Sequence, residues 1–80
     1  MVKLIFDTEF KKAFIKIKDK NTKEKIIKQI SKLKKNSEIG KPMMYGRKGT
    51  RELYISPYRL AYMLEDDKIY ILSLYHKDKQ

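Results

Sequence analysis

Two runs of alternating character and a third run rich in isoleucine, leucine and tyrosine follow one another in the second half of the chain, joined by two short turn sequences. The runs span residues 51–56, 58–64 and 68–75, and the turns are Ser56-Pro57 and Glu65-Asp66-Asp67. A period of two is typical of a strand with one buried face, and short turns join antiparallel neighbours. The pattern therefore predicts a three-stranded antiparallel meander, to which the rest of the fold must adapt.

The start of the chain predicts a strand followed by a helix. Residues 2–6 are apolar except for Lys3 and are enough for a short strand, and Asp7 can cap the helix that follows. Phe10, Phe14 and Ile17 then recur at the spacing i, i+4, i+7, which gives the helix one apolar face.

A second helix is predicted over residues 22–35, after a polar break. Asn21 with Glu24 has the form of a capping box, which would begin this helix. Residues 36–50 contain the glycines and a proline and are expected to form a loop. The sequence thus predicts an α+β fold, with an N-terminal strand, a helical hairpin and a meander packed on the helices.

Length limits this fold to a single domain over residues 1–80. A chain of 80 residues buries only about 60% of the surface that it exposes when unfolded, which leaves room for one small core. The chain has no cysteine, and no apolar run approaches the roughly 18 residues of a membrane span. We therefore expect a soluble cytoplasmic protein without disulfides, thiolate zinc sites or membrane attachment.

The charge balance points to a polyanionic partner. Twenty lysines and arginines face ten acidic residues, a net charge of +10, and all arginines lie in the second half. Such a surface attracts nucleic acid through its phosphates. Because guanidinium matches phosphate geometry, specific contacts are expected from the second half, at Arg47, Lys48 and Arg51. The alternative is that many of the lysines only keep a small domain solvated.

Arg59 is the first candidate for chemistry, because it lies in the middle of the central predicted strand. Leu53 and Ile55 are expected to face the core, so Glu52 and Tyr54 would share the uncovered face with Arg59. Glu52 could act as a base or only form a salt bridge, and Tyr54 could stack on a base or fill an aromatic cluster.

His76 is the second candidate. Antiparallel pairing about the turn at residues 65–67 brings it to the same end of the sheet as Arg59, where the two could share a site. Cleavage of RNA by its own 2′-hydroxyl needs a proton acceptor, a cation for the phosphate and a donor for the 5′-oxygen. Arg59 fits the cation and His76 either proton role, unless it is an ordinary surface histidine. Neither a phosphate-binding glycine motif nor a metal-ligand pattern occurs, so no cofactor or metal is expected.

The order of elements and four short motifs resemble the RelE/ParE superfamily of type II toxin–antitoxin toxins over nearly the whole chain. The motifs are Gly40-Lys41-Pro42, Gly49-Thr50-Arg51-Glu52-Leu53, Tyr58-Arg59-Leu60-Ala61-Tyr62 and Tyr75-His76-Lys77. RelE-like members are ribonucleases that cut messenger RNA in the ribosomal A site without metal. The resemblance implies the same activity here, with mRNA, the ribosome and a RelB-like antitoxin as partners in a hetero-oligomer.

The resemblance also implies roles for single residues. Arg59 matches the arginine that contacts the scissile phosphate in RelE-like toxins, and His76 matches a proton-transfer histidine of the YoeB-like branch. Lys77 and Lys79 fall where RelE-like enzymes keep basic tail residues.

The base is the point at which this sequence departs from the family pattern. Met43 stands where the YoeB-like branch has a glutamate base, and Glu52 and Tyr54 stand where RelE has strand lysines. Glu52 is the expected substitute. Two alternatives remain: a ParE-like poison of DNA gyrase with the same fold, or a non-catalytic nucleic-acid-binding module.

Overall fold

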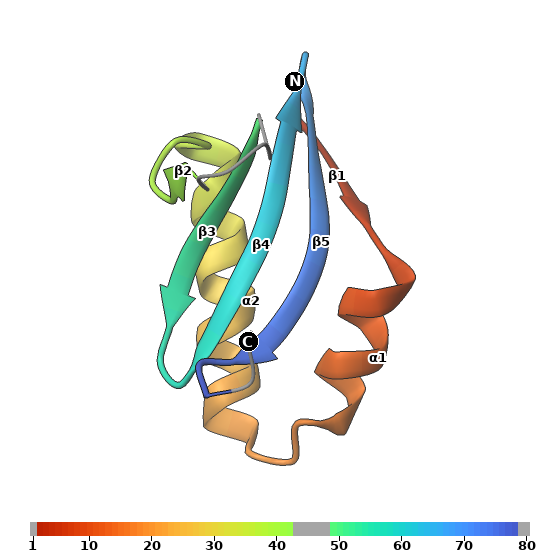
Figure 1. Cartoon of the computed structure of the whole chain (residues 1–80), viewed down its shortest axis with the longest axis vertical. Helices are drawn as coiled ribbons and strands as arrows, with labels where there is room; N and C mark the ends of the chain where they lie inside the picture. The colour runs from red at the N-terminus through yellow and green to blue at the C-terminus, as the bar shows by residue number, and fades with distance from the viewer. Residues whose placement is uncertain (1, 43–48, 79–80) are drawn as a thin grey trace.

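One sheet of five strands, with two helices on one of its faces, makes up the parts of the chain that the computed structural model describes, residues 2–42 and 49–78. The elements are β1 (Lys3–Phe6), α1 (Thr8–Lys16), α2 (Lys20–Lys35), β2 (Lys41–Pro42), β3 (Thr50–Ile55), β4 (Tyr58–Glu65) and β5 (Lys68–His76). The strand order is β1-β5-β4-β3-β2, with β1 parallel to β5 and the other pairs antiparallel. The predicted α+β fold and its meander are confirmed (Figure 1).

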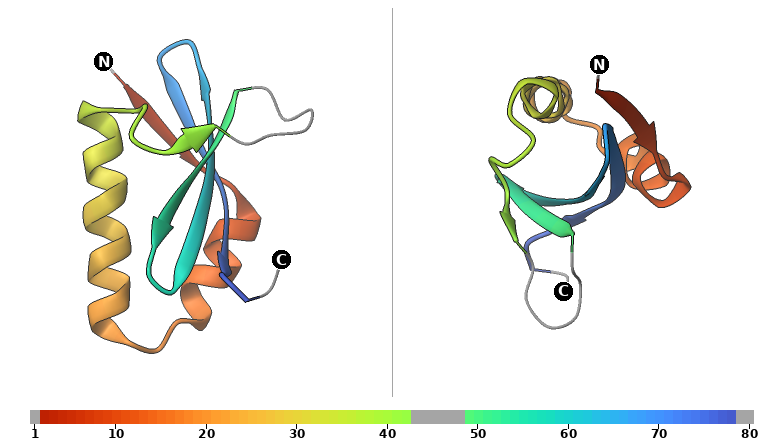
Figure 2. Two further views of the ribbon diagram at one scale, coloured as in Figure 1. Left: turned by 60° about the vertical axis from the view of Figure 1, so that its left-hand side comes forward. Right: turned by 90° about the horizontal axis from the view of Figure 1, so that it is seen from above.

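The two helices lie on the same side of the sheet but diverge along it. Figure 1 shows α1 beside β5 and α2 behind β3 and β4, and the view from above in Figure 2 shows no helix on the opposite sheet face. The core lies between these layers. Its largest fully buried side chains are Ile26, Leu33, Leu60, Tyr62, Ile69 and Ile71. None of the helices in the described ranges is long and apolar enough to cross a membrane.

The cap of α2 differs from the prediction. The helix begins at Lys20, and Asp19 is its N-cap: one carboxylate oxygen accepts from the backbone N–H of Asn21 at 3.2 Å. The other accepts from the Thr22 hydroxyl at 2.6 Å, and this bond lowers the pKa of Asp19. The predicted Asn21 and Glu24 capping box was therefore wrong, because an aspartate two residues earlier satisfies the first free N–H groups.

The predicted loop over residues 36–50 contains a short strand. β2 pairs with β3, so that Lys41 lies opposite Glu52. Gly40, just before β2, donates its backbone N–H to the hydroxyl of Tyr62 at 2.9 Å, and this hydroxyl donates to the carbonyl of Ser37, also at 2.9 Å. Burial raises the pKa of Tyr62. These bonds fasten the chain after α2 to the helix side of the sheet.

A β-bulge changes the faces of β5. Ile71 pairs with Tyr62 and Ser73 pairs with Ala61, so Leu72 is an extra residue without an opposite partner. One extra residue inverts the alternation of side chains beyond it. After the bulge Leu74 faces the core, and the residues that follow exchange the faces that strict alternation would give them.

Candidate functional site

Arg59 is the second residue of the central strand β4, and it lies on the sheet face that no helix covers. Its Nη1 atom is 2.8 Å from Oε1 of Glu52 on β3, a salt bridge between side chains that are 33% and 21% exposed. The hydroxyl of Tyr75, on β5, donates to the second oxygen of the same carboxylate. Three neighbouring strands thus bring a cation, an anion and a phenol into direct contact.

Tyr54 completes the surroundings of the guanidinium. It is the β3 partner of Arg59, and the guanidinium carbon lies 5.6 Å from the centre of its ring, a distance at which cation and ring attract. The ring is 51% exposed. The sequence-based placement of Glu52 and Tyr54 on the face of Arg59 is therefore confirmed.

The guanidinium is only partly satisfied. Its Nε is buried and has no hydrogen-bond partner among residues 2–42 and 49–78. A buried donor without a partner costs free energy. The side chain is still 33% exposed, and a phosphate has the geometry to accept two guanidinium N–H groups at once.

His76 does not join this group. It pairs with Tyr58, and the two rings meet edge to face with centres 5.6 Å apart. Tyr58 shares the face of Leu60, so His76 reaches the same end of the sheet as Arg59 but on the helix side. The expectation of a shared site was wrong, because the bulge at Leu72 exchanges the faces of the residues after it and puts Tyr75, and not His76, on the face of Arg59.

Arg51 lies on the opposite face of β3 from Glu52. It pairs with Tyr62 on the helix side, and its Nη1 donates to the carbonyl oxygens of Gly40 at 2.7 Å and Glu38 at 3.3 Å. This arginine therefore holds the segment before β2 against the sheet. Its expected contact with RNA stays a prediction.

Of the other predicted site residues, only Lys77 lies within the described ranges. Lys77 is exposed, and its backbone N–H donates to the carbonyl of Pro57 at 3.0 Å. It therefore lies beyond Arg59, at the end away from Glu52. Arg47, Lys48, Met43 and Lys79 lie outside the described residues.

Sequence reasoning missed two residues of this face. Tyr75 was missed because nothing in the sequence marks the bulge. Lys41 was missed because residues 36–50 have the composition of a loop, although its pairing with Glu52 puts it on the same face. Only recognition of β2 would have revealed it. No three histidine, cysteine or carboxylate side chains gather into a metal-binding group in the described ranges.

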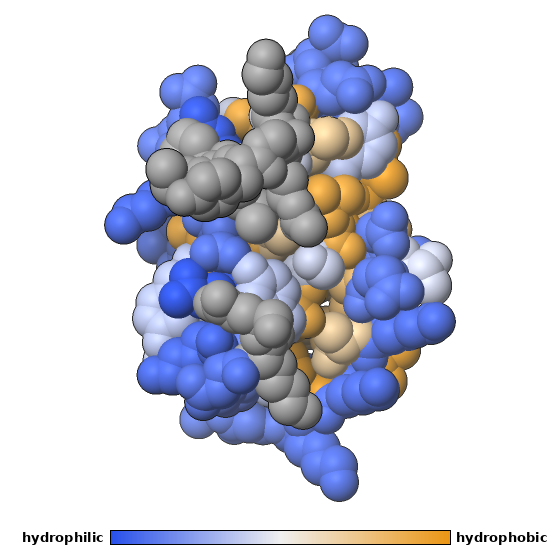
Figure 3. Space-filling view, viewed as in Figure 1, coloured by the Kyte–Doolittle hydropathy of each residue, from blue (hydrophilic) through white to orange (hydrophobic). Residues whose placement is uncertain are grey.

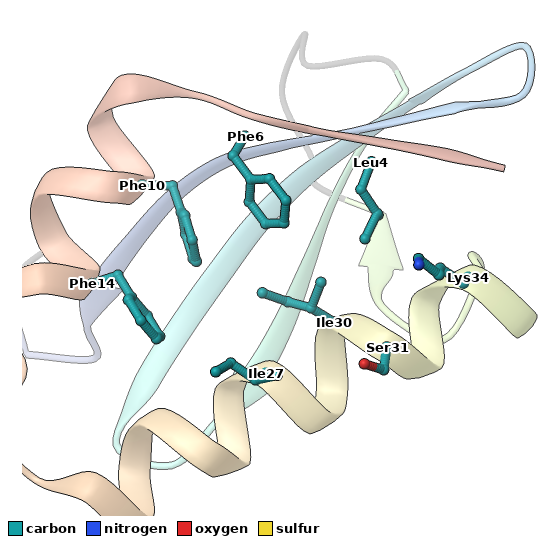
Figure 4. Close-up of a pocket in the computed structure, with 8 residues that line it drawn as sticks. All are labelled: Leu4, Phe6, Phe10, Phe14, Ile27, Ile30, Ser31 and Lys34. Atoms are coloured by element: carbon teal, nitrogen blue, oxygen red, sulfur yellow. The ribbon is translucent and has the colours of Figure 1, made fainter.

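A separate apolar groove lies on the helix side. It has a volume of about 250 Å³ and runs between α2 and the β1–α1 segment. Phe6, Phe10 and Phe14 line one wall, while Ile27 and Ile30 line the other (Figure 4). Ile27 is 54% exposed, so the groove leaves apolar surface in contact with water.

Most of the positive charge also lies on the helix side. Residues 8–35 contain eleven lysines against three acidic residues, a net charge of +8 out of +10. The sheet face looks different in Figure 3, where hydrophilic side chains border a strip of apolar ones near β5. The charge that would attract a polyanion over a distance is thus separate from the guanidinium of Arg59.

Comparisons with known proteins agree with this architecture. A search of curated protein sequences finds no match. Among solved structures, the isolated RelE toxin of Escherichia coli is 19% identical with a TM-score of 0.82, over 100% of this chain and 88% of that one. The RelBE2 toxin–antitoxin complex of Mycobacterium tuberculosis is 21% identical, with a TM-score of 0.82 over 95% and 98%. The YoeB dimer of Staphylococcus aureus is 23% identical, with a TM-score of 0.79 over 94% and 97%.

These structural similarities show the fold alone, whereas a match to a family model is a similarity of sequence. The model for the ParE toxin of the type II toxin–antitoxin system parDE matches residues 4–80. That match includes every described residue of the sheet face built around Arg59. The chain is therefore a member of the ParE toxin family of type II toxin–antitoxin systems, within the RelE/ParE superfamily.

Proposed function

We propose that this toxin is a cytoplasmic, metal-independent endoribonuclease that cleaves messenger RNA on the ribosome. The proposed active site is the sheet face around Arg59. The observation that carries the proposal is the guanidinium itself. It stands on an open sheet face, 2.8 Å from a carboxylate and beside an exposed tyrosine ring. A cation for a phosphate, a base for a hydroxyl and a surface for a nucleobase are thus next to one another.

The proposed reaction is a transfer within the RNA. The 2′-oxygen attacks the adjacent phosphorus while Glu52 takes its proton, and the bond from phosphorus to the 5′-oxygen breaks. Lys77 gives a proton to the 5′-oxygen, and Arg59 stabilises the charge on the phosphate oxygens. The products are a 2′,3′-cyclic phosphate and a 5′-hydroxyl.

The positions along the strands support these roles. Glu52 lies opposite Ala61, two residues beyond Arg59 on β4, whereas Lys77 bonds to Pro57, two residues before it. The proposed base and acid are therefore on opposite sides of the phosphate-binding group. An in-line displacement needs this arrangement, because the attacking and leaving oxygens are on opposite sides of the phosphorus.

A second candidate is inhibition of DNA gyrase. The family model that matches this chain is that of ParE, and ParE-like toxins are expected to poison gyrase with the same fold. The position of His76 away from Arg59 also favours it, since the YoeB-like proton-transfer group is absent from the site.

The proposed partner in the cell is an antitoxin, because the RelBE2 structure named above is a toxin–antitoxin complex. We expect this antitoxin to be acidic, since the chain carries a net charge of +10. An amphipathic segment would place apolar side chains in the groove that Ile27 lines, and its acidic side chains would face the lysines of α1 and α2. Lys34, at the groove, is such a lysine.

Translation of a defined message in a reconstituted system tests the nuclease proposal. The wild-type chain should cut the message, and Arg59→Ala should slow cleavage roughly 100- to 1000-fold, the usual effect of removing one transition-state donor. Lys68→Ala is the control, because Lys68 is an exposed cation at the far end of β4 and β5. An intact message, together with arrested supercoiling in a gyrase assay, would instead support the second candidate.

A further inference from the structure

Lys41 lies beside the carboxylate of the Arg59 site, although it belongs to a different part of the sequence. β2 pairs antiparallel with β3, and Lys41 is the residue directly opposite Glu52. Opposite residues of an antiparallel pair direct their side chains to the same face, with Cβ atoms about 5 Å apart. The lysine is therefore on the uncovered face, separated from Arg59 only by Glu52.

The ammonium of Lys41 is exposed and has no salt-bridge partner in the described ranges of the chain. Its four-carbon stem is long enough to pass Glu52 and reach an anion held by Arg59. Within residues 2–42 and 49–78 the stem carries no hydrogen bond or ion pair that would hold it elsewhere.

The position of Lys41 is fixed from the opposite side of the sheet. Gly40 is held by two groups: the Tyr62 hydroxyl accepts its N–H at 2.9 Å, and Arg51 donates to its carbonyl at 2.7 Å. A Cβ on Gly40 would lie 2.5 Å from the Tyr62 hydroxyl, so this close approach requires glycine. The backbone next to Lys41 therefore has little freedom, which is unusual for a chain between a helix and a short edge strand.

We propose that Lys41 is a second phosphate-binding cation of this site, an inference that rests on the proposed RNA substrate. When RNA binds, the phosphate competes with Glu52 for Arg59. Lys41 then neutralises part of the negative charge that the phosphate and Glu52 bring together. Arg59 contributes a directed fork and Lys41 a mobile point charge, so the two cations have different roles on one phosphodiester.

Two measurements on the same set of variants test this inference: cleavage of a message, and binding of a single-stranded RNA with 2′-O-methyl riboses, which cannot be cleaved. The set is wild type, Lys41→Ala, Lys41→Gln, Lys41→Arg and the control Lys68→Ala. We expect the alanine and glutamine variants to cleave about 10- to 100-fold more slowly, the usual effect of losing a charged hydrogen bond. Lys41→Arg should retain most of the activity.

Binding provides the reading that a purely structural role would not change. Loss of one phosphate contact should lower the slope of log Kd against log salt by roughly 0.7 for Lys41→Ala. Lys68→Ala should leave both the cleavage rate and this slope as in wild type.

The outcomes separate this inference from the proposed function. If Lys41→Ala and Lys68→Ala behave alike in both measurements, Lys41 is not a phosphate ligand, whether or not the wild type cleaves. If the wild type binds RNA without cleaving it and only Lys41→Ala lowers the slope, the nuclease proposal fails while the phosphate contact of Lys41 stands.

Discussion

Nη1 of Arg59 and Oε1 of Glu52 lie 2.8 Å apart on neighbouring strands, and the carboxylate occupies the place where a substrate phosphate would approach. Glu52→Gln keeps the shape of the side chain but removes its charge and its ability to take a proton. We expect cleavage to fall roughly 100-fold or more, as for loss of a general base. RNA binding should tighten, because a negative charge leaves the phosphate site. Cleavage and binding assays on the same protein check this, with Glu65→Gln at the exposed β4–β5 turn as control. Equal losses of binding and cleavage would contradict a role as base.

Tyr75 and His76 are adjacent in sequence but face opposite sides of the sheet. Tyr75 donates to Glu52, so Tyr75→Phe should lower cleavage about 10-fold by leaving the carboxylate less well fixed. His76→Ala removes a ring that contacts Tyr58, and it should leave the cleavage rate within about twofold. The same single-turnover assay measures both. A large loss for His76→Ala with none for Tyr75→Phe would mean that the site is built on the other face.

The groove between the helices gives a prediction about the antitoxin. Ile27→Asp puts a charge into the apolar groove, and it should weaken the complex roughly 10- to 100-fold, because the antitoxin segment would leave that charge buried. Ile15→Asp is the matched control, since Ile15 is 74% exposed on α1 and does not line the groove. Titration with the antitoxin encoded beside the toxin gene measures both affinities. Equal affinities would place the antitoxin elsewhere.

The sequence predicted the meander because its alternation reflects a sheet that is buried on one side only. Leu53 and Ile55 were expected to face the core, and the structure confirms this, which also correctly placed Glu52 and Tyr54 with Arg59. The pairing of β3 with β4 has no bulge, so strict alternation holds for these residues. Local pattern was therefore sufficient for half of the candidate site.

The rest of the site depends on features that local pattern does not carry. The alternation in the sequence does not mark the bulge at Leu72, and this bulge decides whether residue 75 or residue 76 shares the face of Arg59. β2 has only two residues, and the segment before it is held by the hydrogen bonds of Gly40 to Tyr62 and Arg51. Because these partners are distant in sequence, the local composition indicates a loop and does not reveal the strand.

Tyr62 and Gly40 give a prediction about stability. Gly40→Ala would place a methyl group 2.5 Å from the Tyr62 hydroxyl and 2.7 Å from a ring carbon, and we expect it to lower the free energy of unfolding by about 1–3 kcal/mol. Tyr62→Phe leaves the N–H of Gly40 and the carbonyl of Ser37 without this partner, at a cost of similar size. Urea unfolding measures both. Glycine at this position would be unimportant if Gly40→Ala unfolded like the wild type.

Tyr62 also makes stability depend on alkaline pH. Burial raises the pKa of its phenol above the ordinary value of 10.0, so the unfolded chain releases this proton at a lower pH than the folded chain does. The contribution is complete below pH 10 and declines as the pH rises toward the folded pKa, because the unfolded state then holds fewer protons. Between about pH 8 and about pH 10.5 the urea midpoint of unfolding should therefore decrease more for wild type than for Tyr62→Phe. Parallel declines in the two proteins would show that the phenol is not shielded from water, and that the bonds to Ser37 and Gly40 open in solution.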